Sequence, residues 1–105
     1  MIGGRIRLLA VVAGALLLGA CAQNGTPAEK GRQVYLAYCT SCHGSDPAKD
    51  GPVGPAVKGA SRDLLEARIL RGTYPPGYAP KRQTTVMQPM PEVAASIADL
   101  AAYLR

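Results

Sequence analysis

The sequence contains no tryptophan and no phenylalanine, and its only aromatic side chains are five tyrosines among 105 residues. A chain of this length forms at most one ordinary domain, and so few large apolar side chains leave it little material for a core. Its 12 glycines and 9 prolines favour loops over long regular elements. These shortages exclude a doubly wound nucleotide fold, a barrel enzyme and a repeat array. They also indicate that a metal, disulfides or a cofactor stabilises the chain.

Charged residues are also sparse. The chain has 12 lysines and arginines against 7 aspartates and glutamates, a formal net charge of +5. Arg5 and Arg7 precede an apolar N-terminal run, so the remainder of the chain carries 10 basic and 7 acidic residues, or +3. Because the basic residues are scattered, this excess is too weak for a nucleic-acid-binding surface. We therefore expect no nucleic-acid partner.

No hydrophobic run is long enough to span a membrane. The apolar run Leu8–Leu18 has 11 residues, and only 13 uncharged residues separate Arg7 from Cys21, whereas a spanning helix needs roughly 20. Arginines before the run and small residues after it are instead typical of a secretory signal. We predict that residues 1–20 are a signal peptide.

The end of this signal, Leu18-Gly19-Ala20-Cys21, resembles a bacterial lipobox, in which the cysteine is acylated and becomes the new N-terminus. The alternative is ordinary cleavage at Ala20-Cys21-Ala22, which would discard the cysteine. Two or more acyl chains hold a protein stably on a membrane. We expect a lipid anchor at Cys21 on the periplasmic side of a bacterial envelope, with residues 21–26 as a tether. By resemblance to lipoproteins of enteric bacteria, Ala22 indicates the outer membrane.

Once Cys21 is acylated or removed, two cysteines remain, Cys39 and Cys42, and the chain has a single histidine. A zinc site would need two further ligands, and a thioredoxin-like disulfide would need a βαβ context that the sequence lacks. His43 directly follows the second cysteine, and C-x-x-C-H is the attachment motif of c-type haem. The thiols reach two vinyl groups along one porphyrin edge, and the imidazole becomes the proximal iron ligand. We predict one covalently bound haem c per chain.

Local signals predict three helices. Thr26-Pro27-Ala28-Glu29 is a capping box with proline in the first helical position, so a helix should run from Pro27 to about Cys39. Ser61 is the expected N-cap of a second helix that ends at Gly72, and residues 94–104 form the third. Three arginines of the second helix are expected to face solvent: Arg62, Arg68 and Arg71. The alternative is that one of them pairs with a haem propionate.

Two long segments separate these helices. Residues 44–60 are rich in glycine and proline and predict a loop. Residues 73–91 contain five prolines and no usable periodicity. A structureless stretch of that length in a small domain is expected to be either functional or disordered. On a haem protein it is well placed to carry the sixth iron ligand.

The chain resembles the class I cytochrome c family, because several residues occur in the order typical of that family: Gly31, Tyr35, the motif from Cys39 to His43, Gly54-Pro55, a Met-Pro-rich loop, Leu100 and Tyr103. The resemblance implies a small all-α fold over residues 27–105, with about three main helices and long loops wrapped around one haem. It implies that the first and last helices cross near the haem at Tyr35 and Tyr103. It also implies that the Pro55 carbonyl accepts the ring N–H of His43, which orients the ligand.

The sixth ligand follows by elimination, because a second histidine is absent and only Met87 and Met90 lie in the distal loop. The dipeptide Met90-Pro91 favours Met90. Spacing favours Met87, which lies 16 residues before Tyr103, whereas Met90 lies 13 before it. We predict Met87, with Met90 as the alternative.

A haem with both axial positions filled has no site for a substrate, and thioether ligation raises its reduction potential. We therefore expect an electron carrier rather than an enzyme, with a donor and an acceptor protein as transient partners and no small-molecule substrate. One alternative is a five-coordinate haem that binds or senses a ligand. Another is a haem subunit fixed in an oxidoreductase complex.

Overall fold

The computed structural model describes residues 25–105 together with Gly14. The predictions for the lipobox cysteine Cys21, for Ala22 and for most of the signal segment concern residues outside this part. Within it, no helix is long and apolar enough to cross a membrane.

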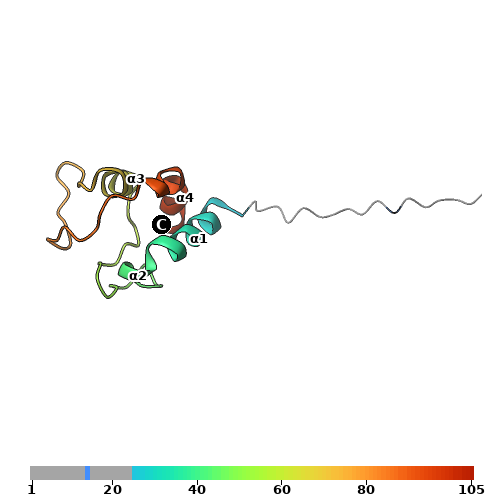
Figure 1. Cartoon of the computed structure of the whole chain (residues 1–105), viewed down its shortest axis with the longest axis horizontal. Coiled ribbons are helices and arrows are strands. Elements are labelled where there is room, and N and C mark those ends of the chain that lie inside the picture. Colours follow the sequence, from blue (N-terminus) through green and yellow to red (C-terminus); the bar gives the residue numbers. More distant parts are fainter. Residues whose placement is uncertain (1–13, 15–24) are drawn as a thin grey trace, which may run out of the picture.

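The described residues form short helices joined by loops and contain no β-strand (Figure 1). The elements are α1 (Pro27–Tyr38), α2 (Thr40–His43), α3 (Arg62–Glu66), the π-helical turn η1 (Ala67–Arg71), the 3-10 helix η2 (Pro91–Ser96) and α4 (Ile97–Tyr103). The predicted all-α fold is confirmed. Long loops, residues 44–61 and 72–90, separate α2 from α3 and η1 from η2.

Helix α1 begins at the predicted capping box. The Glu29 amide donates to Thr26 Oγ1 at 3.2 Å, and the Thr26 amide donates to Glu29 Oε2 at 3.1 Å. Each side chain thus satisfies an amide that has no partner within the helix. Pro27 occupies the first helical position, where its missing N–H costs nothing.

Helix α2 follows α1 after the single residue Cys39 and was not predicted. It consists of the last four residues of the C-x-x-C-H motif. The Gly44 amide donates to the Thr40 carbonyl at 2.9 Å, and Gly44 ends the helix with a φ of +79°. That backbone conformation favours glycine, so Gly44 was the available signal for this helical turn.

The second predicted helix is present as α3 continued by η1. Its N-cap is Ser61, whose Oγ accepts from the Leu64 amide at 3.1 Å, and it ends at Gly72 with a φ of +66°, as expected. The widening into a π-turn at Ala67 was not predicted. The third predicted helix, residues 94–104, is divided between two elements: the 3-10 helix η2, which already begins at Pro91, and α4, which begins at Ile97.

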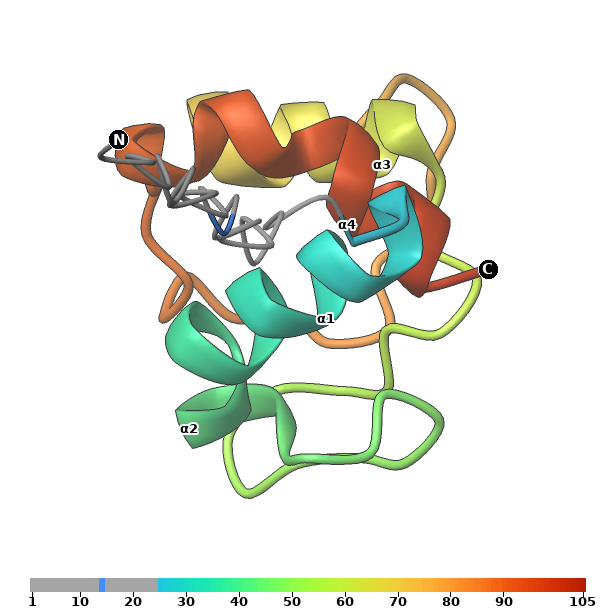
Figure 2. The same cartoon turned by 90° about the vertical axis from the view of Figure 1, so that its right-hand side faces the viewer.

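Helices α1 and α4 pack directly against each other, and Figure 2 shows them side by side. A Cβ atom at Gly31 would collide with the Asp99 carbonyl and would lie 2.9 Å from Cβ of Tyr103. The rings of Tyr35 and Tyr103 are in contact, with centroids 5.5 Å apart at 52°. The absence of a side chain at Gly31 therefore allows the two backbones to approach closely.

The hydrophobic core is small. Seven hydrophobic residues are buried in the described part of the chain: Tyr35, Ala67, Ile69, Val93, Ile97, Leu100 and Leu104. All of them lie on or next to the helical elements, and the two long loops contribute none. The core therefore lies on one side of the domain, where α1, η1, η2 and α4 meet.

Gly31→Ala is expected to lower the free energy of unfolding of the holoprotein by about 2 kcal/mol, because the added methyl forces α1 away from α4. Alanine is a better helix former than glycine, so helix propensity alone predicts that the free energy of unfolding rises. Lys30→Ala, an exposed change on the same turn, is the control and should have little effect. Denaturant titration measures both variants, and a Gly31→Ala protein as stable as the parent would contradict the packing argument.

Candidate functional site

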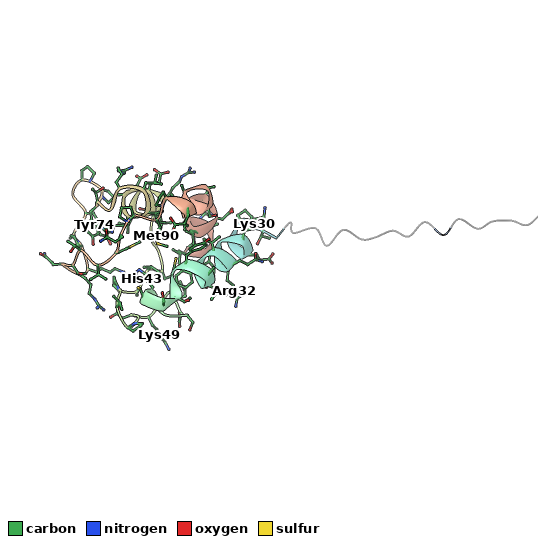
Figure 3. All side chains as sticks on the ribbon, in the orientation of Figure 1. Lys30, Arg32, His43, Lys49, Tyr74 and Met90 are labelled. Carbon is green, nitrogen blue, oxygen red and sulfur yellow. The ribbon has the colours of Figure 1, made fainter. Side chains whose placement is uncertain are left out.

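A cavity of about 550 Å³ lies between the helices and the two long loops. Its size is in the usual range for small-molecule and cofactor sites. All five predicted haem-binding and iron-ligating residues contribute to its wall: Cys39, Cys42, His43, Met87 and Met90. In Figure 3, His43 and Met90 lie between α1 and Tyr74. The structure therefore brings residues far apart in the sequence to one site.

The two cysteines are free thiols on the cavity wall. They lie one turn apart, and the Cys42 amide donates to the Cys39 carbonyl at 3.3 Å. Cys39 is half-buried, whereas Cys42 is exposed. Burial raises the pKa of the Cys39 thiol to about 11, with a smaller contribution from the charge of Cys42. Cys39 is therefore protonated at neutral pH.

His43 is oriented by a single hydrogen bond. Its Nδ1 lies 2.8 Å from the Pro55 carbonyl oxygen. Because a carbonyl oxygen only accepts, Nδ1 carries the proton and donates, and the lone pair lies on Nε2. This is the arrangement that proteins use to fix the tautomer of a metal-ligating imidazole.

The loop that follows α2 folds back over the imidazole. A Cβ atom at Gly54 would lie 2.5 Å from Cε1 and 2.7 Å from Nδ1 of His43. The Gly54 amide donates to the Cys42 carbonyl at 2.8 Å, which ties this loop to the motif. Gly54 thus leaves room for the ring, a role that the sequence analysis did not assign to it.

The loop before η2 is tied to the loop that holds Pro55. The Asp50 carboxylate accepts from the Ala56 amide at 2.8 Å and pairs with Arg82 at 3.4 Å. Lys81 Nζ donates to the Ala56 carbonyl at 2.8 Å. These contacts join the two sides of the cavity, and no local sequence signal indicates them.

Met87 and Met90 lie at the two ends of a four-residue segment, and both are half-buried against the core. The Met90 amide donates to the Ile69 carbonyl at 2.7 Å. The Met87 carbonyl accepts from Arg68 Nη2 at 3.4 Å. Both thioether side chains belong to the cavity wall.

Arg68 also lines the cavity, so the expectation that it faces solvent is wrong. It is half-buried, its Nη1 donates to the Gly72 carbonyl at 2.8 Å, and its guanidinium lies 4.3 Å from the centre of the Tyr74 ring. Arg62 and Arg71 are exposed as expected. The three arginines look alike in the sequence, because the partners that distinguish Arg68 lie in the loop that follows.

Tyr35 connects the helix crossing to the cavity. Its hydroxyl donates to the Gly44 carbonyl at 2.7 Å, and its ring lines the cavity. Burial is the largest cause of the raised pKa of Tyr35, and the charge of Cys39 is the second. Tyr103 is not part of the cavity wall and contacts Tyr35 from α4.

These donors fit a haem better than a bare metal ion. Among the described residues, no three histidine, cysteine, aspartate or glutamate side chains converge where they could hold a metal ion. A haem brings its own four nitrogen ligands and needs from the chain an axial imidazole, two thiols and apolar walls. The cavity offers His43, Cys39 and Cys42 among mostly apolar side chains.

Comparison with known proteins gives the family. A family model described as Cytochrome c matches residues 28–105. Searches of curated proteins and of solved structures each returned no match. Because the match covers most of the chain, the chain belongs to the cytochrome c family. Residues 28–105 are a class I cytochrome c domain, which binds haem c covalently and transfers electrons between redox partners as a carrier, not as an enzyme by itself.

Gly54→Ala is expected to displace the His43 ring and weaken its hydrogen bond to the Pro55 carbonyl. A less basic imidazole stabilises ferric iron less, so the reduction potential of the holoprotein should rise and the Nδ1 proton should exchange faster. Voltammetry and proton NMR measure the two effects. Ala48→Gly, a one-carbon change at an exposed position of the same loop, is the control. An unchanged potential together with an unchanged exchange rate would contradict the steric argument.

Proposed function

We propose that this chain is an exported, lipid-anchored c-type cytochrome with one haem per chain, which carries single electrons between a donor and an acceptor protein. The observation that carries the proposal is the orientation of His43. Its Nδ1 is engaged by Pro55, and its Nε2 is left with a lone pair in a cavity that also contains two thiols and two thioethers.

Each residue has a separate task in this proposal. Cys39 and Cys42 form the two thioether links, and His43 is the proximal ligand. Met87 supplies the distal ligand, with Met90 as the alternative. The bound haem supplies a single one-electron couple between ferrous and ferric iron. The protein contributes axial ligands of fixed orientation, apolar walls and limited access of water.

If His43 and a methionine both bind the iron, no coordination site would remain for a substrate. The redox partners would approach the exposed side of the cavity, where Tyr38 and Val53 are 47% and 44% exposed next to the exposed Cys42. Interfaces between redox proteins are usually small, and we propose that both encounters are transient.

A lipid anchor at Cys21 is compatible with this use of the domain. Helix α1 begins on the side opposite the loop between η1 and η2 (Figure 1). If the tether at residues 21–26 attaches the domain to a membrane, that loop would therefore face away from the lipid surface. The indication for the outer membrane is the residue after the cysteine, Ala22.

Met87→Ala is expected to abolish the near-infrared sulfur-to-iron charge-transfer band, lower the reduction potential and admit CO to the ferrous protein, because a thioether ligand raises the potential and blocks the sixth position. Met90→Ala is the matched control and should retain the band. Absorption spectroscopy, voltammetry and CO flash photolysis measure these effects.

If Met90→Ala alone loses the band, Met90 is the distal ligand instead. A parent protein that lacks the band and binds CO rapidly would establish a five-coordinate haem and refute the carrier proposal. His43→Ala should yield no stable holoprotein in a host that matures cytochromes c, because it removes the proximal ligand.

Cys21→Ser should move the protein from the membrane fraction to the soluble periplasmic fraction while its haem spectrum is unchanged, because only the acyl chains hold it on the membrane. Fractionation followed by mass spectrometry of the N-terminal peptide measures both location and acylation. A parent protein that is found soluble, with an N-terminus beyond Cys21, would show ordinary signal cleavage.

A further inference from the structure

The four-residue segment from Met87 to Met90 rests on the end of the α3–η1 helix through three contacts. At one end, Arg68 Nη2 donates to the Met87 carbonyl at 3.4 Å. In the middle, Pro89 packs so closely on Gly72 that a Cβ atom there would lie 3.2 Å from the proline ring. At the other end, the Met90 amide donates to the Ile69 carbonyl at 2.7 Å. Both ends of the segment are thus held by neighbouring residues of η1.

Two consecutive residues of η1, Arg68 and Ile69, contact the same segment by different means. Consecutive side chains of a helix point in different directions, but here only one of the two uses its side chain. Ile69 presents a backbone carbonyl, which near the end of a helix needs a partner from outside. Arg68 presents its guanidinium. The contact at Met90 is therefore made by backbone alone, and the contact at Met87 depends on one side chain.

The guanidinium of Arg68 is itself held in place. It donates to the Gly72 carbonyl at 2.8 Å and lies over the Tyr74 ring, which stacks on Tyr78 with ring centroids 5.5 Å apart and planes 9° apart. Among the described residues, its side chain forms no ion pair with a carboxylate. Its planar fork can satisfy two carbonyl groups at once, which a lysine ammonium does less specifically.

We propose that Arg68 is a positioning residue for the Met87 thioether. It acts through the Met87 carbonyl, fixing the backbone of that residue so that its side chain stays in the cavity. This inference rests on the proposed ligation by Met87. It also distinguishes the two methionines, because loss of Arg68 frees the Met87 end of the segment and leaves the Met90 end attached to Ile69.

The test compares Arg68→Met, which keeps much of the side-chain volume without the donors, with Arg71→Met, which removes an exposed arginine from the same turn. The holoproteins are examined for the near-infrared charge-transfer band of the ferric form and for the rate of CO binding to the ferrous form. We expect Arg68→Met to weaken the band and speed CO binding about tenfold, the effect of losing one charge-assisted hydrogen bond. Arg71→Met should match the parent.

Arg68→Lys extends the test, because a cation at the same place should restore part of the band and slow CO binding again. If Arg68→Met fails to mature, Arg68→Lys is compared directly with the parent and should still bind CO faster. Parent-like bands and CO rates in the Arg68 variants, or equal losses in Arg68→Met and Arg71→Met, would overturn the proposal. A parent protein without the band would instead refute methionine ligation itself. Failure of the Arg68 proposal and failure of methionine ligation are therefore distinguishable.

Discussion

Two helices from opposite ends of the described chain meet where Gly31 leaves room for the Asp99 carbonyl, and the remaining elements are arranged around that contact. The crossing places Tyr35 of α1, four residues before Cys39 of the attachment motif, against Tyr103 of α4. The Gly59 amide donates to the Leu104 carbonyl, which joins the loop after α2 to the same centre. The cavity is the space that this pair of helices encloses with α3, η1 and the two loops.

The cavity takes the place that a hydrophobic core has in other small domains. Seven buried side chains gathered on one side are few for a domain of this size, and many apolar residues face the cavity rather than one another. Leu64, for example, is half-buried on its wall. A haem bound in the cavity would provide a common apolar surface against which these residues pack. The cofactor and the fold would then depend on each other.

Features that depend on adjacent residues were predictable from the sequence. The capping box at Thr26, the N-cap at Ser61 and the helix end at Gly72 depend on neighbours within four residues, and all three are present. The C-x-x-C-H motif predicted the haem-binding residues, which lie together on the cavity wall. Resemblance to the family predicted the contact of Pro55 with His43, which is present. The proximity of Gly54 to the imidazole, in contrast, depends on how an irregular loop folds back.

The same limit explains why Arg68 was missed and why Met87 and Met90 were hard to separate. Their environment depends on the path of residues 73–90, which has no periodicity from which a path could be inferred. Within that segment, Lys81 and Arg82 are tied to the loop of Asp50 by contacts at the surface, where the Arg82 and Asp50 side chains are 40% and 66% exposed. Such pairs are weak and screened by salt. We therefore expect this side of the domain to open first, through local unfolding that costs less free energy than global unfolding, while α1 and α4 stay packed together.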